Sequence, residues 1–353
     1  MKKFLALLLA LTMALALVAC GGGNDSSNTA TSGGDSESGF EPMTWKFACS
    51  ATETSPWVDG AKEFARIVGE KTGGAITVQY YPADQLTAGS QTDGIQALMD
   101  GTTEISMHSN LIWSSFDQRF NVVSLPFLFD SVEEADAALD GAGGEALGEI
   151  LENEYNVHLL GIAENGFRHI TNSKHPIESL ADMNGLKMRV AGSQLLNRSY
   201  ELWGADYTNA NWSEVFTALQ TGTYDGQENP LPTADAASIQ EVQSYLTYWT
   251  GAYDCLFFCM NADLYNSLSP ELQAIVDEAG QEACEYEREL NRGQDQEIMD
   301  KWAEAGVEIT ELTPEAAAEF SEASASVYDE FADELTPELI EAFTSVTQAD
   351  NAA

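Results

Sequence analysis

Short apolar runs of strand character alternate with amphipathic helical segments along most of this chain. The runs 45–50 and 75–82 enclose a segment whose apolar residues recur at helical spacing: Trp57, Ala61, Phe64, Ala65 and Val68. The same patterns predict further helices at 93–101, 132–154, 193–203 and 212–221, and further strands at 104–109, 156–164 and 185–190. This alternation favours an α/β fold with largely parallel sheets covered by helices.

Three later predicted helices begin with the same capping motif, a hydroxyl residue followed by a proline at the first helical position. The pairs are Ser269-Pro270, Thr313-Pro314 and Thr336-Pro337. After the first of them, only Gly280 and Gly293 interrupt a helical pattern over 271–305. The pattern predicts an exposed acidic helix of roughly 30 residues, which is longer than most helices of compact domains. Such a helix could brace two lobes.

The N-terminus has the features of a secretory signal. Lys2 and Lys3 precede an apolar run that is too short for a permanent membrane span, and Leu-Val-Ala-Cys follows, ending at Cys20. The pattern resembles a bacterial lipobox and predicts that Cys20 carries a lipid such as palmitate after cleavage of 1–20. The alternative is an ordinary signal peptide with a coincidental cysteine. Residues 21–41 are rich in Gly, Ser, Asn and Thr and predict a flexible tether.

The charge balance excludes one class of partner. The chain has 15 basic and 57 acidic residues and a formal net charge of −42, so the phosphates of nucleic acid would be repelled. Of the cysteines beyond Cys20, Cys255 and Cys259 lie in an apolar stretch. We expect them in a core, in preference to a metal site or a disulfide.

No motif in the sequence indicates a catalytic site or a cofactor-binding site. The sequence contains no G-x-S-x-G, H-E-x-x-H, Walker or C-x-x-C motif. The stretch 141–146 fits G-x-G-x-x-A, but a helical segment precedes it where a dinucleotide-binding fold needs a strand. We therefore expect no enzyme, no cofactor and no metal.

Positive charge gathers in one short stretch, 166–190, which has four basic and two acidic residues. Arg168 and Arg189 follow or end predicted strands, where ligands of open α/β sheets bind. Two guanidinium groups there would suit a carboxylate, through paired and charge-assisted hydrogen bonds. The alternative is that a local Asp or Glu neutralises each arginine. The residues alone do not decide between ligand binding and such ion pairs. Lys174 and Lys187 are expected on the solvated flank.

Several blocks of the sequence resemble the DctP-type solute receptors of TRAP (tripartite ATP-independent periplasmic) transporters. They are "EKTGGAITVQYYPADQL", "SLPFLFDS", "ENGFRHITNSKHPI", "LADMNGLKMRV", "SEVFTALQTGTYDGQENPL" and "SYLTYW". They occur in order over most of the chain, and "LQTGTYDGQENP" is the most specific. The resemblance implies a two-lobe α/β fold like that of type II periplasmic binding proteins, with a long helix spanning both lobes. We expect lobe I at 42–165 plus 254–293, and lobe II at 166–253 plus 294–347.

The resemblance also implies the site. The family's carboxylate-binding arginine falls on Arg189 and its second basic residue on Arg168. Asn229 would hold the ligand carboxylate and the principal arginine, and Trp212 would cover the ligand's apolar face. Positions that contact the far end of the ligand fall on Gln91, Ser109 and Ser50.

The sequence is therefore interpreted as a receptor, lipid-anchored to the outer face of the cell membrane and monomeric. It would bind a small carboxylate, similar to a C4-dicarboxylate or a sugar acid, and deliver it to the small and large membrane subunits of a TRAP permease. One alternative is a receptor of the same fold that serves a membrane sensor protein. The other is a secreted hydrolase that uses scattered carboxylates.

Overall fold

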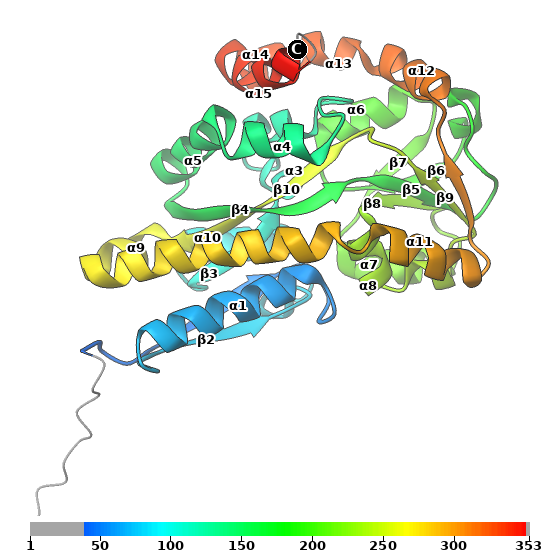
Figure 1. Cartoon of the computed structure of the whole chain (residues 1–353). Coiled ribbons are helices and arrows are strands. Elements are labelled where there is room, and N and C mark those ends of the chain that lie inside the picture. Colours follow the sequence, from blue (N-terminus) through cyan, green and yellow to red (C-terminus); the bar gives the residue numbers. More distant parts are fainter. Residues whose placement is uncertain (1–38, 351–353) are drawn as a thin grey trace, which may run out of the picture. The chain divides into compact units, whose positions relative to one another are not determined.

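The computed structural model describes residues 39–350. The predicted signal peptide 1–20, the lipidation site Cys20 and the tether as far as residue 38 lie outside this range. Within it, no helix combines the length and the apolar character that a membrane span requires. Residues 39–350 form two sheets covered by helices (Figure 1).

The first sheet has five strands in the order β2-β1-β3-β10-β4. Its strands are β1 (Met43–Cys49), β2 (Ile76–Tyr81), β3 (Ile105–Ser109), β4 (Val157–Phe167) and β10 (Tyr253–Asn261). One core forms where α1 (Pro56–Lys71) and α10 (Pro270–Arg292) pack together and against β2 and β4. Its largest members are aromatic, with Phe47 stacked on Phe258 and Phe64 edge-on to both.

The second sheet has six strands in the order β11-β9-β5-β8-β6-β7. Its strands are β5 (His169–Asn172), β6 (Lys187–Val190), β7 (Asp206–Asn209), β8 (Gly226–Asn229), β9 (Tyr245–Tyr248) and β11 (Glu308–Glu311). Helices α7 (Trp212–Gln220), α8 (Leu231–Ala236) and α11 (Asp295–Glu304) share a smaller core with it, centred on Trp302 and Leu246.

The remaining helices include short segments beside the first sheet and the C-terminal group. They are α2 (Gln91–Met99), α3 (Asn110–Trp113), α4 (Val132–Leu139), α5 (Ala142–Glu154), α6 (Gln194–Leu202), α9 (Ala262–Ser267), α12 (Pro314–Ser324), α13 (Ser326–Glu330), α14 (Ala332–Leu335) and α15 (Pro337–Asp350). The predicted helix 132–154 is two helices, because the chain turns at Gly141. The hydroxyls of Ser269 and Thr313 cap α10 and α12 as predicted.

Both sheets are mixed, so the expectation of largely parallel sheets is wrong. Every antiparallel pairing involves β4, β5, β9 or β10. These are the strands by which the chain passes from one sheet to the other, since β4 leads directly into β5 and β9 leads into β10. A strand that enters a sheet through such a crossover runs against its neighbours, whereas the βα units on either side keep parallel order.

The predicted helix over 271–305 is also corrected. It is two helices, because α10 ends at Arg292, Gly293 caps it, and α11 begins at Asp295. Figure 1 shows α10 along the first sheet and α11 beside α8 of the second sheet. A glycine in this position weakens the helix and lets the chain change direction between the two packing partners.

Helix α10 is not an exposed brace. It lies along β4, the edge strand of the first sheet, and its side chains bind that strand's free backbone groups. Arg288 donates to Ile162 O at 2.6 Å, Glu287 accepts from Glu164 N at 2.9 Å, and Asn291 donates to Asn165 O at 3.0 Å. Covering an edge in this way removes a template for pairing with other chains.

The C-terminal helices contact elements of both predicted lobes. Helix α15 packs on α4 and α5, whereas α12 and α13 pack on α6. The sequence-based division places residues 294–347 in lobe II, although α4 and α5 belong to its lobe I. The exact lobe boundaries therefore stay a prediction.

Gly280 allows α10 to approach β4 closely. A Cβ built at Gly280 would lie 2.6 Å from Leu160 Cβ and 2.9 Å from Leu160 O. We expect Gly280→Ala to lower the free energy of unfolding by about 1–3 kcal/mol, as overpacked positions do. Chemical denaturation of the two proteins measures the difference.

The matched control is Gly69→Ala in α1, where the nearest atom to an added Cβ is Ile76 O at 3.9 Å. This change should be neutral or raise the free energy of unfolding by up to about 1 kcal/mol, through helix propensity. Equal stability of Gly280→Ala and the parent protein would contradict the close-packing argument.

Candidate ligand-binding site

A cavity of about 370 Å³ lies between elements of the two sheets. The first sheet and its helices contribute Ser50, Ala51, Trp57, Gln91, Ser109, Ile112, Asn165 and Asp254, whereas the second contributes Arg189, Ala191, Trp212, Asn229 and Thr233. Arg168 lines the cavity from the connection between β4 and β5.

All seven residues predicted to contact the ligand line this one cavity: Ser50, Gln91, Ser109, Arg168, Arg189, Trp212 and Asn229. They occupy the ends of strands and the starts of helices. Ser109 and Asn229 end β3 and β8, and Gln91 and Trp212 begin α2 and α7. Strand ends and helix starts leave side chains and backbone groups free to face a crevice, which explains the convergence.

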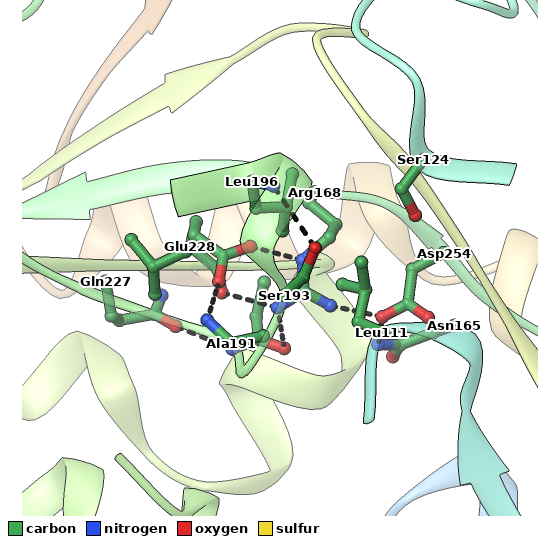
Figure 2. A network of polar contacts seen from close by, with 12 residues as sticks. Leu111, Ser124, Asn165, Arg168, Ala191, Ser193, Leu196, Gln227, Glu228 and Asp254 are labelled. Atoms are coloured by element: carbon green, nitrogen blue, oxygen red, sulfur yellow. Dashed lines mark hydrogen bonds and ion pairs between the residues drawn. The ribbon is translucent and has the colours of Figure 1, made fainter. Parts of the chain in front are cut away.

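Arg168 is buried and fully engaged by protein groups. Its guanidinium forms ion pairs with Glu228 of β8 and Asp254 of β10, one carboxylate from each sheet (Figure 2). It also donates to Glu228 O at 2.9 Å and to Asn229 Oδ1 at 3.1 Å. The two acids that neutralise Arg168 are 60 and 86 positions away in the sequence.

The two carboxylates are themselves held in place. Glu228 Oε1 accepts from Ala191 N at 2.9 Å and so fixes the turn after β6 (Figure 2). Asp254 accepts from Ser109 Oγ at 2.7 Å and from Asn165 Nδ2 at 2.6 Å. Burial raises the pKa of Asp254, and Arg168 and these hydrogen bonds offset only part of the effect. Burial alone would lower the pKa of Arg168, but Glu228 and Asp254 raise it above its usual value.

Arg189 is also buried, but its surroundings differ from those of Arg168. Its Nε and Nη2 donate to Ala210 O at 3.1 and 2.7 Å, and its Nη1 lies 4.0 Å from Glu228 Oε1. The guanidinium carbon is 5.6 Å from the centre of the Trp212 ring, within reach of a cation–π interaction. Burial lowers the pKa of Arg189 to about 10, with a further contribution from Arg168. The group stays charged at neutral pH, but its charge is incompletely neutralised.

Some predicted details differ. The expectation that Asn229 holds the principal arginine is not met, because Asn229 accepts from Arg168 while Ala210 O binds Arg189. The reason is the register, in which Arg168 precedes β5 and His169 pairs with Asn229.

Lys174 is exposed and pairs with Asp225 at 3.0 Å, and Lys187 is exposed too, as predicted for the flank. Cys255 and Cys259 are buried and free, as expected.

Some residues that shape the cavity were not predicted from the sequence. Glu228 and Asp254 neutralise Arg168, and Trp57, which the helical pattern placed only in a core, lines the cavity. A carboxylate inside the otherwise apolar run of β10 is the signal that could have drawn attention to Asp254. Within residues 39–350, no group of three or more His, Cys, Asp or Glu side chains is placed to hold a metal ion.

Comparisons with known proteins agree with this geometry. The profile of the family "Bacterial extracellular solute-binding protein, family 7" (DctP) matches residues 47–335. The 2,3-diketo-L-gulonate-binding periplasmic protein YiaO of Escherichia coli is 32% identical over 282 residues, covering 80% of this chain and 85% of that protein.

Two solved structures extend the comparison. A sugar acid binding protein from Advenella mimigardefordensis, in complex with galactonate, has a TM-score of 0.84 at 29% identity and covers 88% of this chain and 99% of its own. A TRAP periplasmic solute binding protein from Sulfurospirillum deleyianum, with bound succinate, has a TM-score of 0.81 at 30% identity, with coverage of 87% and 100%.

The chain belongs to family 7 of the bacterial extracellular solute-binding proteins, the DctP family of TRAP transporter receptors. This confirms the resemblance found in the sequence, and the two-lobe α/β fold class is confirmed with it.

The pairing of Arg168 with Glu228 generates a stability prediction. Glu228→Gln keeps the shape of the side chain but removes one of two carboxylates from a buried cation. We expect the free energy of unfolding to fall by about 3–5 kcal/mol, the usual effect of breaking a buried ion pair. Denaturant titration measures it.

The control is Glu330→Gln, which removes the partner of Arg198 from a solvent-exposed ion pair. Because exposed pairs contribute little to stability, this variant should unfold almost like the parent. Similar behaviour of the two variants would show that Glu228 does not stabilise the buried cation.

Proposed function

We propose that this protein is a lipid-anchored extracytoplasmic receptor that binds a small organic acid and delivers it to a TRAP permease. The observation that carries the proposal is the contrast between the two arginines of the cavity. Two carboxylates neutralise Arg168, whereas Arg189 has a carbonyl oxygen and a carboxylate 4.0 Å away.

A buried cation without a close counter-ion is costly, because burial takes it out of water. A ligand carboxylate beside Arg189 would supply that counter-ion. The planar guanidinium and the carboxylate match in geometry, and charge-assisted hydrogen bonds are stronger than neutral ones. Arg189 is therefore the principal anchor of this proposal, and Arg168 shapes the wall of the cavity, where its own ion pairs hold it rigid.

The other lining residues have supporting roles in the proposal. Trp212 stands beside Arg189 and would cover an apolar face of the ligand. Gln91 and Ser109, on the first sheet's side, would contact the ligand's far end. Binding by residues of both sheets would favour closure of the lobes around the ligand, and closure would be reversed on delivery.

The relatives support the ligand class and the partner. The names of the three similar proteins refer to 2,3-diketo-L-gulonate, galactonate and succinate, and each of these molecules carries a carboxylate. The TRAP assignment of the family supports delivery to a permease with small and large membrane subunits. The proposal assigns the protein no catalytic step, because transfer to a permease needs binding followed by release.

The anchor arginine can be tested directly. With the tightest-binding acid of a thermal-shift panel, Arg189→Ala should weaken binding by about 2–5 kcal/mol, because the buried carboxylate loses its partner. This corresponds to about 30-fold to a few thousand-fold in the dissociation constant. Arg189→Lys keeps the charge without the planar fork and should recover only part of the affinity. Calorimetric titration measures all three proteins.

The matched control is Arg198→Ala. Arg198 is an arginine of α6 that pairs with Glu201 and Glu330 and does not line the cavity. Its loss should leave the affinity nearly unchanged, since exposed charges are screened beyond about 8 Å at physiological salt. If Arg189→Ala binds as well as Arg198→Ala, Arg189 is not the anchor.

The lipid anchor has its own test. Cys20→Ala removes the predicted attachment site and should move the protein from the membrane fraction to the soluble fraction. Fractionation followed by immunodetection measures the distribution. Unchanged membrane association of the variant would contradict the assignment of Cys20 as the lipid anchor.

A further inference from the structure

The two walls of the cavity differ in charge, and the difference bears on which acids fit. This step rests on the proposed function, with one ligand carboxylate at Arg189. Among the lining residues, within the described range 39–350, the cations are Arg168 and Arg189. Neither belongs to a strand or helix of the first sheet, whose wall is formed by neutral side chains and the carboxylate of Asp254.

The buried charges balance before a ligand enters. The four buried charges sum to zero, although Glu228 and Asp254 both pair with Arg168 and only Glu228 comes within 4.0 Å of Arg189. One ligand carboxylate has Arg189 to bind. A second carboxylate, reaching toward the first sheet's wall, would meet Asp254 and no cation, because the positive charge of Arg168 is already shared between two acids. Like charges at low dielectric strongly disfavour such a ligand.

The same wall carries hydrogen-bond donors with no partner. Ser50 Oγ and Trp57 Nε1 are buried, and neither finds a hydrogen-bond partner among the described residues. Both residues line the cavity. A buried donor left unpaired costs free energy, so native sites tend to satisfy such groups through a ligand or water.

A hydroxyl group suits this wall better than a carboxylate or a methylene group. Its oxygen accepts from Ser50 or Trp57, and its own proton can go to an acceptor such as Asp254 or Gln91. A carboxylate would accept but would also add charge, and a methylene group would leave the donors unpaired. The wall therefore discriminates by both charge and hydrogen bonding.

We propose that the cavity selects a hydroxylated monocarboxylate, of the aldonate kind, and rejects dicarboxylates and unsubstituted carboxylic acids. Arg189 takes the single carboxylate, and Ser50 and Trp57 recognise hydroxyl oxygens along the chain of the ligand.

The test uses matched acids on the whole chain, solubilised in detergent and titrated calorimetrically. Gluconate and glucarate form one pair, and galactonate and galactarate another, and the members of each pair differ at the end far from the shared carboxylate. Hexanoate has the same carbon number without hydroxyls, and succinate is a short dicarboxylate. We expect an aldonate to bind at least about 100-fold more tightly than its paired dicarboxylate, than hexanoate and than succinate.

Two variants test the donors. Trp57→Phe and Ser50→Ala should each weaken aldonate binding by about 3- to 10-fold, as expected for one hydrogen bond, and leave hexanoate binding unchanged. Trp45→Phe is the matched control, because Trp45 Nε1 is also buried without a partner but does not line the cavity. It should leave aldonate binding unchanged.

The outcomes separate this inference from the proposed function. If a dicarboxylate or hexanoate binds best, and Arg189→Ala abolishes that binding, the inference is overturned and the proposed function stands. If none of the six acids binds but another acid of the thermal-shift panel does, the inference is overturned and the proposed function stands; if no acid of the panel binds, both are overturned. Loss of aldonate and hexanoate affinity to the same extent in Trp57→Phe and Ser50→Ala would show a merely structural role and would overturn the assignment of the donors.

Discussion

The ion pairs of Arg168 hold together groups from both walls of the site, because a buried guanidinium without carboxylate partners is costly. Its two partners come from different sheets, Glu228 from β8 and Asp254 from β10. The ion pairs thus tie the two sheets to one cation at the crossing between β4 and β5. Glu228 also holds Ala191 N, and Asp254 holds Ser109 Oγ. Several cavity-lining groups are positioned through this single network.

The consequence for Arg189 is electrostatic. Because Glu228 is committed to Arg168, its other oxygen reaches Arg189 only at 4.0 Å, and Arg168 adds repulsion. Two carboxylates neutralise one arginine and the other is neutralised only in part, although both are buried and line the same cavity. A receptor needs such an arrangement, since a cation fully neutralised by the protein would bind an anion weakly and one without any partner would destabilise the fold.

Helix α10 packs closely on the edge strand of the first sheet, and the helix ends where the chain passes to the second sheet. Along β4, Gly280 lets α10 approach closely, and the side chains of α10 bind the edge strand's backbone. Beyond Arg292 the helix ends, and α11 packs against α8 of the second sheet. Helix α10 therefore covers the edge of the first sheet, whereas short connections make the passage to the second sheet.

The sequence by itself determined the local elements, because helix caps, apolar periodicity and strand runs depend on near neighbours in the chain. It also brought out the cluster holding Arg168 and Arg189, and its family resemblance led to seven of the fourteen lining residues. It did not distinguish the roles of the two arginines, because Arg168 and Asp254 are 86 positions apart and meet only in the folded protein. The break at Gly293, the mixed sheets and the unpaired donors at Ser50 and Trp57 were likewise decided by tertiary structure. Charge neutralisation and burial depend on which distant groups come into contact, and a one-dimensional pattern does not contain that information.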